Sequence, residues 1–155
     1  MTYKKHKTLE FVLATILMVS LFILLFFEIR FLVTSIAISI IFACMIANLI
    51  VYRRAYPQWK GYGWWMPWKI IVLEIVIFIS AAVLDVIYSI HIGACSLVHI
   101  VLFIFILINA AYDDLYCTTK YEMDRFTSVQ ELFAAYPEAR KRFQRGLFTK
   151  GRKKK

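Results

Sequence analysis

Ionisable side chains interrupt two of the most apolar stretches of the chain, where they could carry protons or bind a cation. Asp85 and His99 lie on either side of the short segment SIHIGA, at similar distances from it. Two consecutive antiparallel helices would bring this acid and this imidazole to one depth, so we expect them to form a polar pair. Glu74 lies eleven residues before Asp85, or about three helical turns, so both acids share one helix face.

A second polar layer is predicted nearer the other end of these helices. Asn48, Glu74 and Asn109 lie at similar depth on three different apolar stretches. In one interpretation the two layers form a proton or cation path, from Glu74 to Asp85 and His99. In the other, each layer satisfies its own hydrogen bonds and holds the helices together. No glycine or proline lies inside these stretches, which disfavours a transporter with broken helices.

Motifs for catalysis and metal binding are not found in the sequence. The histidines, His6, His91 and His99, have no HExxH-type spacing. The cysteines, Cys44, Cys95 and Cys117, include no CxxC pair. Neither a Walker-type loop nor a GxGxxG loop, the two common glycine-rich motifs for binding phosphate, occurs in the sequence. We therefore expect a protein that is not an enzyme, with no catalytic residue, no bound metal and no cofactor.

The composition is that of a membrane protein. The 155 residues are 61% hydrophobic and 19% charged, and the mean hydropathy is +0.67. A soluble domain of this length needs more polar surface to cover its core. All of the 19 Lys and Arg residues except Arg30 cluster at the N-terminus, in the segment 53–69, or after Asp113. Nearly charge-free stretches between such clusters are typical of a polytopic membrane protein.

Four apolar stretches are long enough to cross a bilayer as helices. They cover residues 9–27, 31–52, 70–91 and 94–112. A single helix from Phe11 to Tyr52 would be about 63 Å long, twice the thickness of the hydrocarbon core, so a tight hairpin is expected near residues 28–30. The sequence thus predicts an all-α integral membrane protein, a four-helix transmembrane bundle with short outer turns and a cytoplasmic helical basic tail.

The basic clusters predict the orientation. Four spans place both termini and the central loop on one side, which then carries all the clustered basic residues. The positive-inside rule assigns that side to the cytoplasm. The predicted segments are a cytoplasmic N-terminus at 1–8, a transmembrane domain at 9–112 with a loop at 53–69, and a cytoplasmic tail at 113–155. A bacterial inner membrane and a eukaryotic endomembrane both remain open.

All four tryptophans lie in the central loop, within AYPQWKGYGWWMPWK. Indole rings prefer the headgroup layer, because they combine an apolar body with a polar N–H. We therefore expect interfacial anchors at Trp59, Trp64, Trp65 and Trp68. The alternative is a site for a partner protein or a lipid headgroup, since tryptophan and tyrosine are common in binding hot spots.

The second apolar stretch carries small residues at every fourth position, namely Ser35, Ser39, Ala43 and Ala47. Residues at this spacing form a ridge along one helix face, where another helix backbone can approach closely. We interpret this ridge as a helix-packing seam. The partner helix could belong to this chain or to another copy.

The tail combines helix signals with positive charge. Ser128 and Glu131 have the spacing of a capping box before a short amphipathic segment, and Pro137 is suited to open a second short helix. The basic residues of the tail can bind anionic lipid headgroups. The final RKKK resembles a dilysine-type retrieval signal, but we favour a polybasic tail that enforces the topology.

The outline of four spans with cytoplasmic termini resembles MARVEL-type tetraspan proteins and small phage- or plasmid-encoded exclusion and immunity proteins. No motif specific to either group is present. The predicted function is lateral association in the membrane together with contacts at the cytoplasmic face, as in membrane organisation, trafficking or an accessory subunit. The partners would be the bilayer and a membrane protein or a second copy, with no nucleic acid. The alternatives are a small proton or cation conduit and an exclusion or immunity-type protein.

Overall fold

The computed structural model describes residues 1–27, 31–92 and 95–145. Its long helices are α1 (Tyr3–Phe27), α2 (Phe31–Ala55), α3 (Trp68–Tyr88) and α4 (Leu97–Ala111). A π-helical turn, η2 (Tyr112–Cys117), and α5 (Thr118–Lys120) continue α4 without a break. Within the described residues, four helical segments are long and apolar enough to cross a membrane. The predicted hairpin turn at 28–30 lies outside the described residues.

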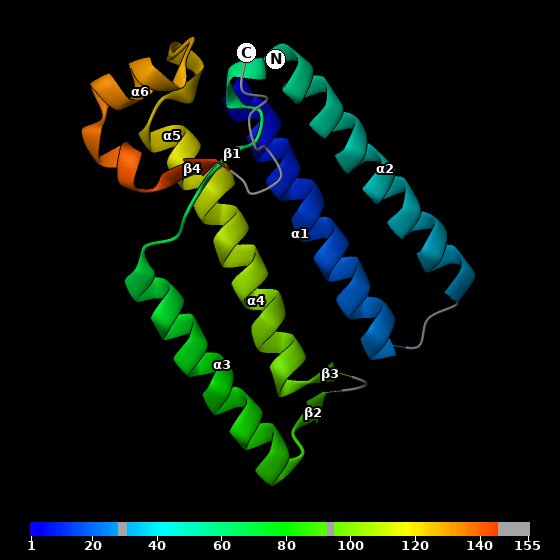
Figure 1. The fold of residues 1–155 in the computed structure, drawn as a ribbon. Coiled ribbons are helices and arrows are strands. Elements are labelled where there is room, and N and C mark those ends of the chain that lie inside the picture. The colour runs from blue at the N-terminus through cyan, green and yellow to red at the C-terminus, as the bar shows by residue number, and fades with distance from the viewer. Residues whose placement is uncertain (28–30, 93–94, 146–155) are drawn as a thin grey trace, which may run out of the picture.

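The helices stand in a row, in the order α2, α1, α4, α3 (Figure 1). α1 packs mainly on α2, α3 packs mainly on α4, and α1 also contacts α4. The chain thus forms two antiparallel helix pairs that meet along α1 and α4, with α2 and α3 at the ends of the row. Apolar side chains such as Ile40 and Val76 remain exposed along the helices. Such wide apolar faces suit a lipid environment and are rare on soluble monomers.

The link between α3 and α4 is a short strand pair. Ser89 takes a left-handed conformation with a φ of 47°, and this ends α3 at Tyr88, earlier than the predicted residue 91. β2 (His91–Ile92) then pairs antiparallel with β3 (Cys95–Ser96). The two ends of the link are therefore held together by backbone hydrogen bonds.

At the other end of the row, the central loop and the tail fold against each other. The loop contains a 3₁₀ turn, η1 (Pro57–Trp59), and β1 (Tyr62–Trp64). The tail contains η3 (Met123–Arg125), α6 (Val129–Ala135), η4 (Pro137–Lys141) and β4 (Phe143–Arg145). β1 pairs antiparallel with β4, so that Trp64 lies opposite Phe143 (Figure 1). We call residues 56–67 and 121–145 together the cap.

The cap has an aromatic core. The Trp64 ring stacks on Tyr121 with ring centroids 4.3 Å apart, and Phe143 lies 4.8 Å from the same tryptophan ring. Leu132 of α6 is fully buried in the same cluster, and Tyr3 of α1 joins it from the long helices. Stacked and tilted aromatic pairs add to the stabilisation that comes from burying their large surfaces. The cap is thus a packed unit at the end of the helices.

The predicted capping residue at the start of α6 is confirmed, and the Glu131 side chain bonds Thr127, the residue before the N-cap residue Ser128. Ser128 Oγ accepts a hydrogen bond from the Glu131 N–H at 3.2 Å, as the sequence predicts. The Glu131 carboxylate accepts from the backbone N–H of Thr127 at 2.8 Å and from the Thr127 hydroxyl. These bonds lower the pKa of Glu131, because they favour its charged form.

Candidate functional site

Glu74 and Asn109 form a polar contact between α3 and α4. Asn109 Nδ2 donates to Glu74 Oε1 at 3.1 Å and to Oε2 at 3.3 Å, and also to the Phe105 carbonyl at 2.8 Å. The pair lies in a groove of about 540 Å³ between the two helices. Six apolar residues line the rest of this groove, namely Ile71, Ile75, Phe78, Leu102, Phe105 and Ile106. The Glu74 carboxylate thus accepts hydrogen bonds from the Asn109 amide but is otherwise surrounded by apolar side chains, which makes its position in the groove costly.

Asn48 does not join this pair. Its side chain exchanges hydrogen bonds with His6, through Asn48 Oδ1 and His6 Nδ1 at 2.8 Å and through Asn48 Nδ2 and the His6 carbonyl at 3.0 Å. Both residues are buried between α1 and α2. The predicted layer of Asn48, Glu74 and Asn109 is thus two separate contacts, because α1 and α4 lie between α2 and α3 in the row.

Asp85 and His99 are not brought together by any hydrogen bond or ion pair among the described residues. His99 lies in the first turn of α4, where its Nδ1 contacts Ser96 Oγ at 2.9 Å. Asp85 Oδ1 is buried and has no hydrogen-bond partner within the described part of the chain. His99 therefore contacts its own N-cap residue Ser96 in this structure, and the pairing with Asp85 stays a prediction.

The small-residue ridge on α2 faces away from the other helices. Ser39, Ala43 and Ala47 are exposed, and Ser35 is half-buried. Ser35, Ser39 and Ala43 line a shallow groove of about 390 Å³ on the outer side of α2. No other helix of the described chain covers this groove, so the ridge is available to a helix from another molecule.

The four tryptophans divide into two pairs. Trp59 and Trp64 are 3% and 9% exposed and belong to the core of the cap, whereas Trp65 and Trp68 are 55% and 70% exposed. This corrects the prediction that all four anchor the loop in the headgroup layer, because the folded tail covers the first pair. Trp65 and Trp68 keep the exposure that an interfacial anchor requires.

A buried ion-pair cluster lies where α1 begins and α4 ends. Lys7 Nζ is 2.8 Å from Asp114 Oδ1, 3.1 Å from Glu10 Oε2 and 3.8 Å from Asp113 Oδ2. The same ammonium group lies 5.4 Å from the centre of the Tyr52 ring. A buried charge requires such partners, since desolvation is costly. Sequence reasoning assigned Lys7 to topology alone, although the adjacent acids Asp113 and Asp114 are a visible signal for a partner of a basic N-terminus.

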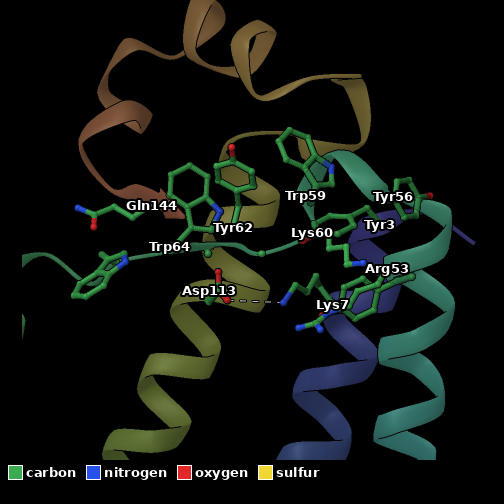
Figure 2. Close-up of a pocket in the computed structure, with 14 residues that line it drawn as sticks. Tyr3, Lys7, Arg53, Tyr56, Trp59, Lys60, Tyr62, Trp64, Asp113 and Gln144 are labelled. Carbon is green, nitrogen blue, oxygen red and sulfur yellow. Dashed lines mark ion pairs between the residues drawn. The ribbon is translucent and has the colours of Figure 1, made fainter. Parts of the chain in front are cut away.

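A cavity of about 310 Å³ opens beside this cluster, between the start of α1, the end of α2 and the cap (Figure 2). Its charged lining consists of Lys7, Arg53, Lys60 and Asp113, with the ion pair between Lys7 and Asp113 on its floor. The aromatic lining consists of Tyr3, Tyr52, Tyr56, Trp59, Tyr62, Trp64 and Trp65. Sequence reasoning considered a headgroup or partner site in this loop but could not supply the cavity residues that come from α1, η2 and β4.

The cavity is lined by two positive charges that have no ion-pair partner among the residues that the structure describes. Arg53 and Lys60 are exposed, and neither forms an ion pair within the described part of the chain. Trp59 Nε1 and Trp64 Nε1 are buried beside the cavity and have no hydrogen-bond partner among the described residues. The walls can therefore offer positive charge and the hydrogen-bond donors of Arg53 and Lys60 at the same place.

Comparison of the chain with models of known protein families, with curated proteins and with solved structures finds no match. Function must therefore be inferred from the chain's own geometry.

Proposed function

We propose that this chain is an integral membrane protein without catalysis that acts by lateral association with further copies of itself, with the cap on the cytoplasmic side. The groove between α3 and α4 carries this proposal. It places the half-buried Glu74 and its partner Asn109 in apolar surroundings between α3 and α4, the pair at one end of the row. A carboxylate facing lipid is costly, and intramembrane acids usually face other helices.

The ridge on α2 is the surface that suits this groove. Small side chains at Ser39, Ala43 and Ala47 let a helix backbone approach closely, while the groove walls are built of large apolar side chains. The two surfaces lie at opposite ends of the row, on α2 and on α3 with α4. All copies insert in the same direction, so α2 of one copy crosses the same layer as the groove of the next.

This head-to-tail arrangement joins two different surfaces, and such contacts close into rings or continue as open arrays. Association would cover the Glu74–Asn109 contact and exclude lipid from it. Membrane organisation, trafficking or accessory-subunit roles all require lateral contacts of this kind. The cytoplasmic orientation of the cap rests on the positive-inside rule.

The proposal is tested with the full chain in liposomes, by energy transfer between donor-labelled and acceptor-labelled copies at a fixed protein-to-lipid ratio. Ala43→Leu should weaken self-association about tenfold or more, because a large side chain holds the neighbouring backbone away. Ala37→Leu is the matched control, since Ala37 is exposed on α2 but does not line the groove. Equal transfer in the parent and in both variants, or no transfer in the parent, would contradict the proposal.

A further measurement identifies the other side of the contact. A cysteine at Ile75 in the α3–α4 groove should crosslink to Cys44 of a second copy, since Cys44 is exposed on α2 beside Ala43. A cysteine at Leu25 on α1 is the control. A cysteine at Ile75 that crosslinks to Cys44 no better than the cysteine at Leu25 would contradict this arrangement.

A further inference from the structure

The cavity at the cap takes no part in the proposed self-association, which involves α2 and the groove between α3 and α4. Its volume of about 310 Å³ is several times the roughly 30 Å³ that one water occupies in the liquid. It lies at the end of the membrane helices, beside residues 52–56 at the end of α2 and the acids that follow α4. In a helix row of this length, that end falls at the level of the lipid phosphates.

Aromatic rings form one wall of the cavity. Trp59, Trp64 and Tyr62 line it, and the Trp59 and Trp64 side chains are nine-tenths or more buried in the packed cap. The cavity therefore has a fixed aromatic wall beside its charged residues.

The basic residues of the cavity indicate that its ligand is an anion. Lys7 is already paired with Asp114, Glu10 and Asp113. Arg53 and Lys60 line the cavity and form no ion pair within the described residues. The positive charge that remains available is therefore theirs, and arginine with lysine is a common combination for phosphate.

We propose that this cavity binds a phosphate group, with Arg53 and Lys60 supplying the positive charge and the hydrogen bonds. The phosphate belongs either to a membrane lipid headgroup or to a soluble phosphate ester. The aromatic lining would hold the carbon part of either ligand. This site does not depend on self-association, because its lining comes from one chain.

Gly63 provides a way to close the cavity. It lines the cavity from β1, and a Cβ placed on it would meet no atom within 4 Å. Its φ is not in the left-handed region, where Gly61 alone is found among the glycines described. A side chain at Gly63 therefore enters open space without straining the strand.

Binding is measured with the purified full chain in detergent, by titration calorimetry. The probes are dioctanoyl phosphatidic acid, glycerol 3-phosphate and inorganic phosphate, and dioctanoylglycerol is the phosphate-free lipid control. We expect binding of at least one phosphate-containing probe and none of dioctanoylglycerol. Tight binding of the lipid alone assigns a headgroup site, and equal binding of glycerol 3-phosphate assigns a soluble ligand.

Two variants locate the site. R53Q/K60Q should weaken binding at least tenfold, and G63L should weaken it to a similar degree by filling the cavity. R54Q/K69Q is the matched control, because both residues are exposed, carry the same charge and do not line the cavity. Thermal melts and near-UV circular dichroism verify that each variant keeps the packed cap.

The proposal is overturned if no phosphate-containing probe binds. It is also overturned if R54Q/K69Q loses as much affinity as R53Q/K60Q, which would indicate attraction by overall charge. Binding that persists in a folded G63L variant would place the phosphate elsewhere. Self-association is measured separately, so failure here leaves the proposed function standing.

Discussion

Lys7 Nζ lies 2.8 Å from Asp114 Oδ1, so a buried ion pair joins the first turns of α1 to the π-helical turn that follows α4. These two segments belong to different helix pairs of the row. The contact therefore fixes one pair against the other at the end that carries the cap. Its partners Glu10 and Asp113 are also close to the ammonium group, at 3.1 and 3.8 Å.

Lys7→Met should destabilise the protein by about 3–5 kcal/mol, because it leaves buried carboxylates unpaired. Lys7→Met combined with Asp114→Leu should recover part of this loss. Unfolding by SDS in mixed micelles, followed by circular dichroism, measures both variants. Lys5→Met is the control, since Lys5 is exposed, and its effect should stay within about 0.5 kcal/mol. Equal effects at Lys5 and Lys7 would show that the cluster does not hold the helices.

Glu131 should make the cap sensitive to acid. Hydrogen bonds from Thr127 lower its pKa in the folded state. The stabilisation is therefore present above the unfolded pKa of about 4.3 and is lost as the pH falls through the lower folded value. Thermal melts between pH 7 and pH 3 should show a smaller acid-induced decrease in Glu131→Gln than in the parent. Glu138→Gln, a change at another exposed acid, should leave the pH profile of the parent unaltered.

The two pairs of polar residues on α3 and α4 predict opposite results in double-mutant cycles. Glu74→Ala and Asn109→Ala should be coupled by about 0.5–2 kcal/mol, the range for hydrogen bonds between membrane helices. Asp85→Ala and His99→Ala should be additive within about 0.5 kcal/mol, because no hydrogen bond or ion pair joins the two residues in the described part of the chain. SDS unfolding measures all the variants. Coupling between Asp85 and His99 would mean that the residues meet in the membrane.

The helices could be predicted because their signal is local. An apolar run of about 20 residues is enough to specify a membrane helix, whatever lies elsewhere in the chain. The polar contacts were harder, since they depend on the order of the helices in the row. Asn48 and Glu74 match in depth but belong to α2 and α3, which lie at opposite ends (Figure 1).

The cap shows what a local pattern cannot reveal. β1 and β4 are far apart in the sequence, and neither carries an alternation that identifies its partner. The loop predicted tryptophan anchors, and the tail predicted short helices. Only the pairing of the two segments buries Trp59 and Trp64 and closes one wall of the cavity. The loop sequence alone does not reveal this pairing, and so it predicted an interfacial position for all four tryptophans.

The conduit hypothesis predicts ion flux, and we expect none. Asp85 lies about 16 Å from Glu74 along α3, and Glu74 is held by Asn109. Proteoliposomes with a pH-sensitive dye inside should lose a proton gradient no faster than empty liposomes. Asp85→Asn should leave this rate unchanged. A leak that Asp85→Asn abolishes would favour the conduit. The proton-binding atom would then be the buried Oδ1 of Asp85, which has no hydrogen-bond partner among the described residues.

The tryptophans of the loop should separate into structural and interfacial residues. Trp64→Ala should cost about 3–5 kcal/mol, because it removes a buried ring that stacks on Tyr121 and leaves a cavity. Trp65→Ala, the adjacent and exposed position, should change stability by about 0.5 kcal/mol or less. SDS unfolding measures both changes.

The difference between buried and exposed tryptophans should also appear in fluorescence quenching by lipids. In variants that retain one tryptophan and carry phenylalanine at the other three positions, brominated lipids should quench Trp68 more strongly than Trp59. The reason is exposure, since Trp68 is 70% exposed and Trp59 is 3% exposed. The bromine atoms are placed near the headgroups, where an interfacial indole lies. Equal quenching at the two positions would show that the tail does not cover Trp59 in the bilayer, and the cap would then be an open surface.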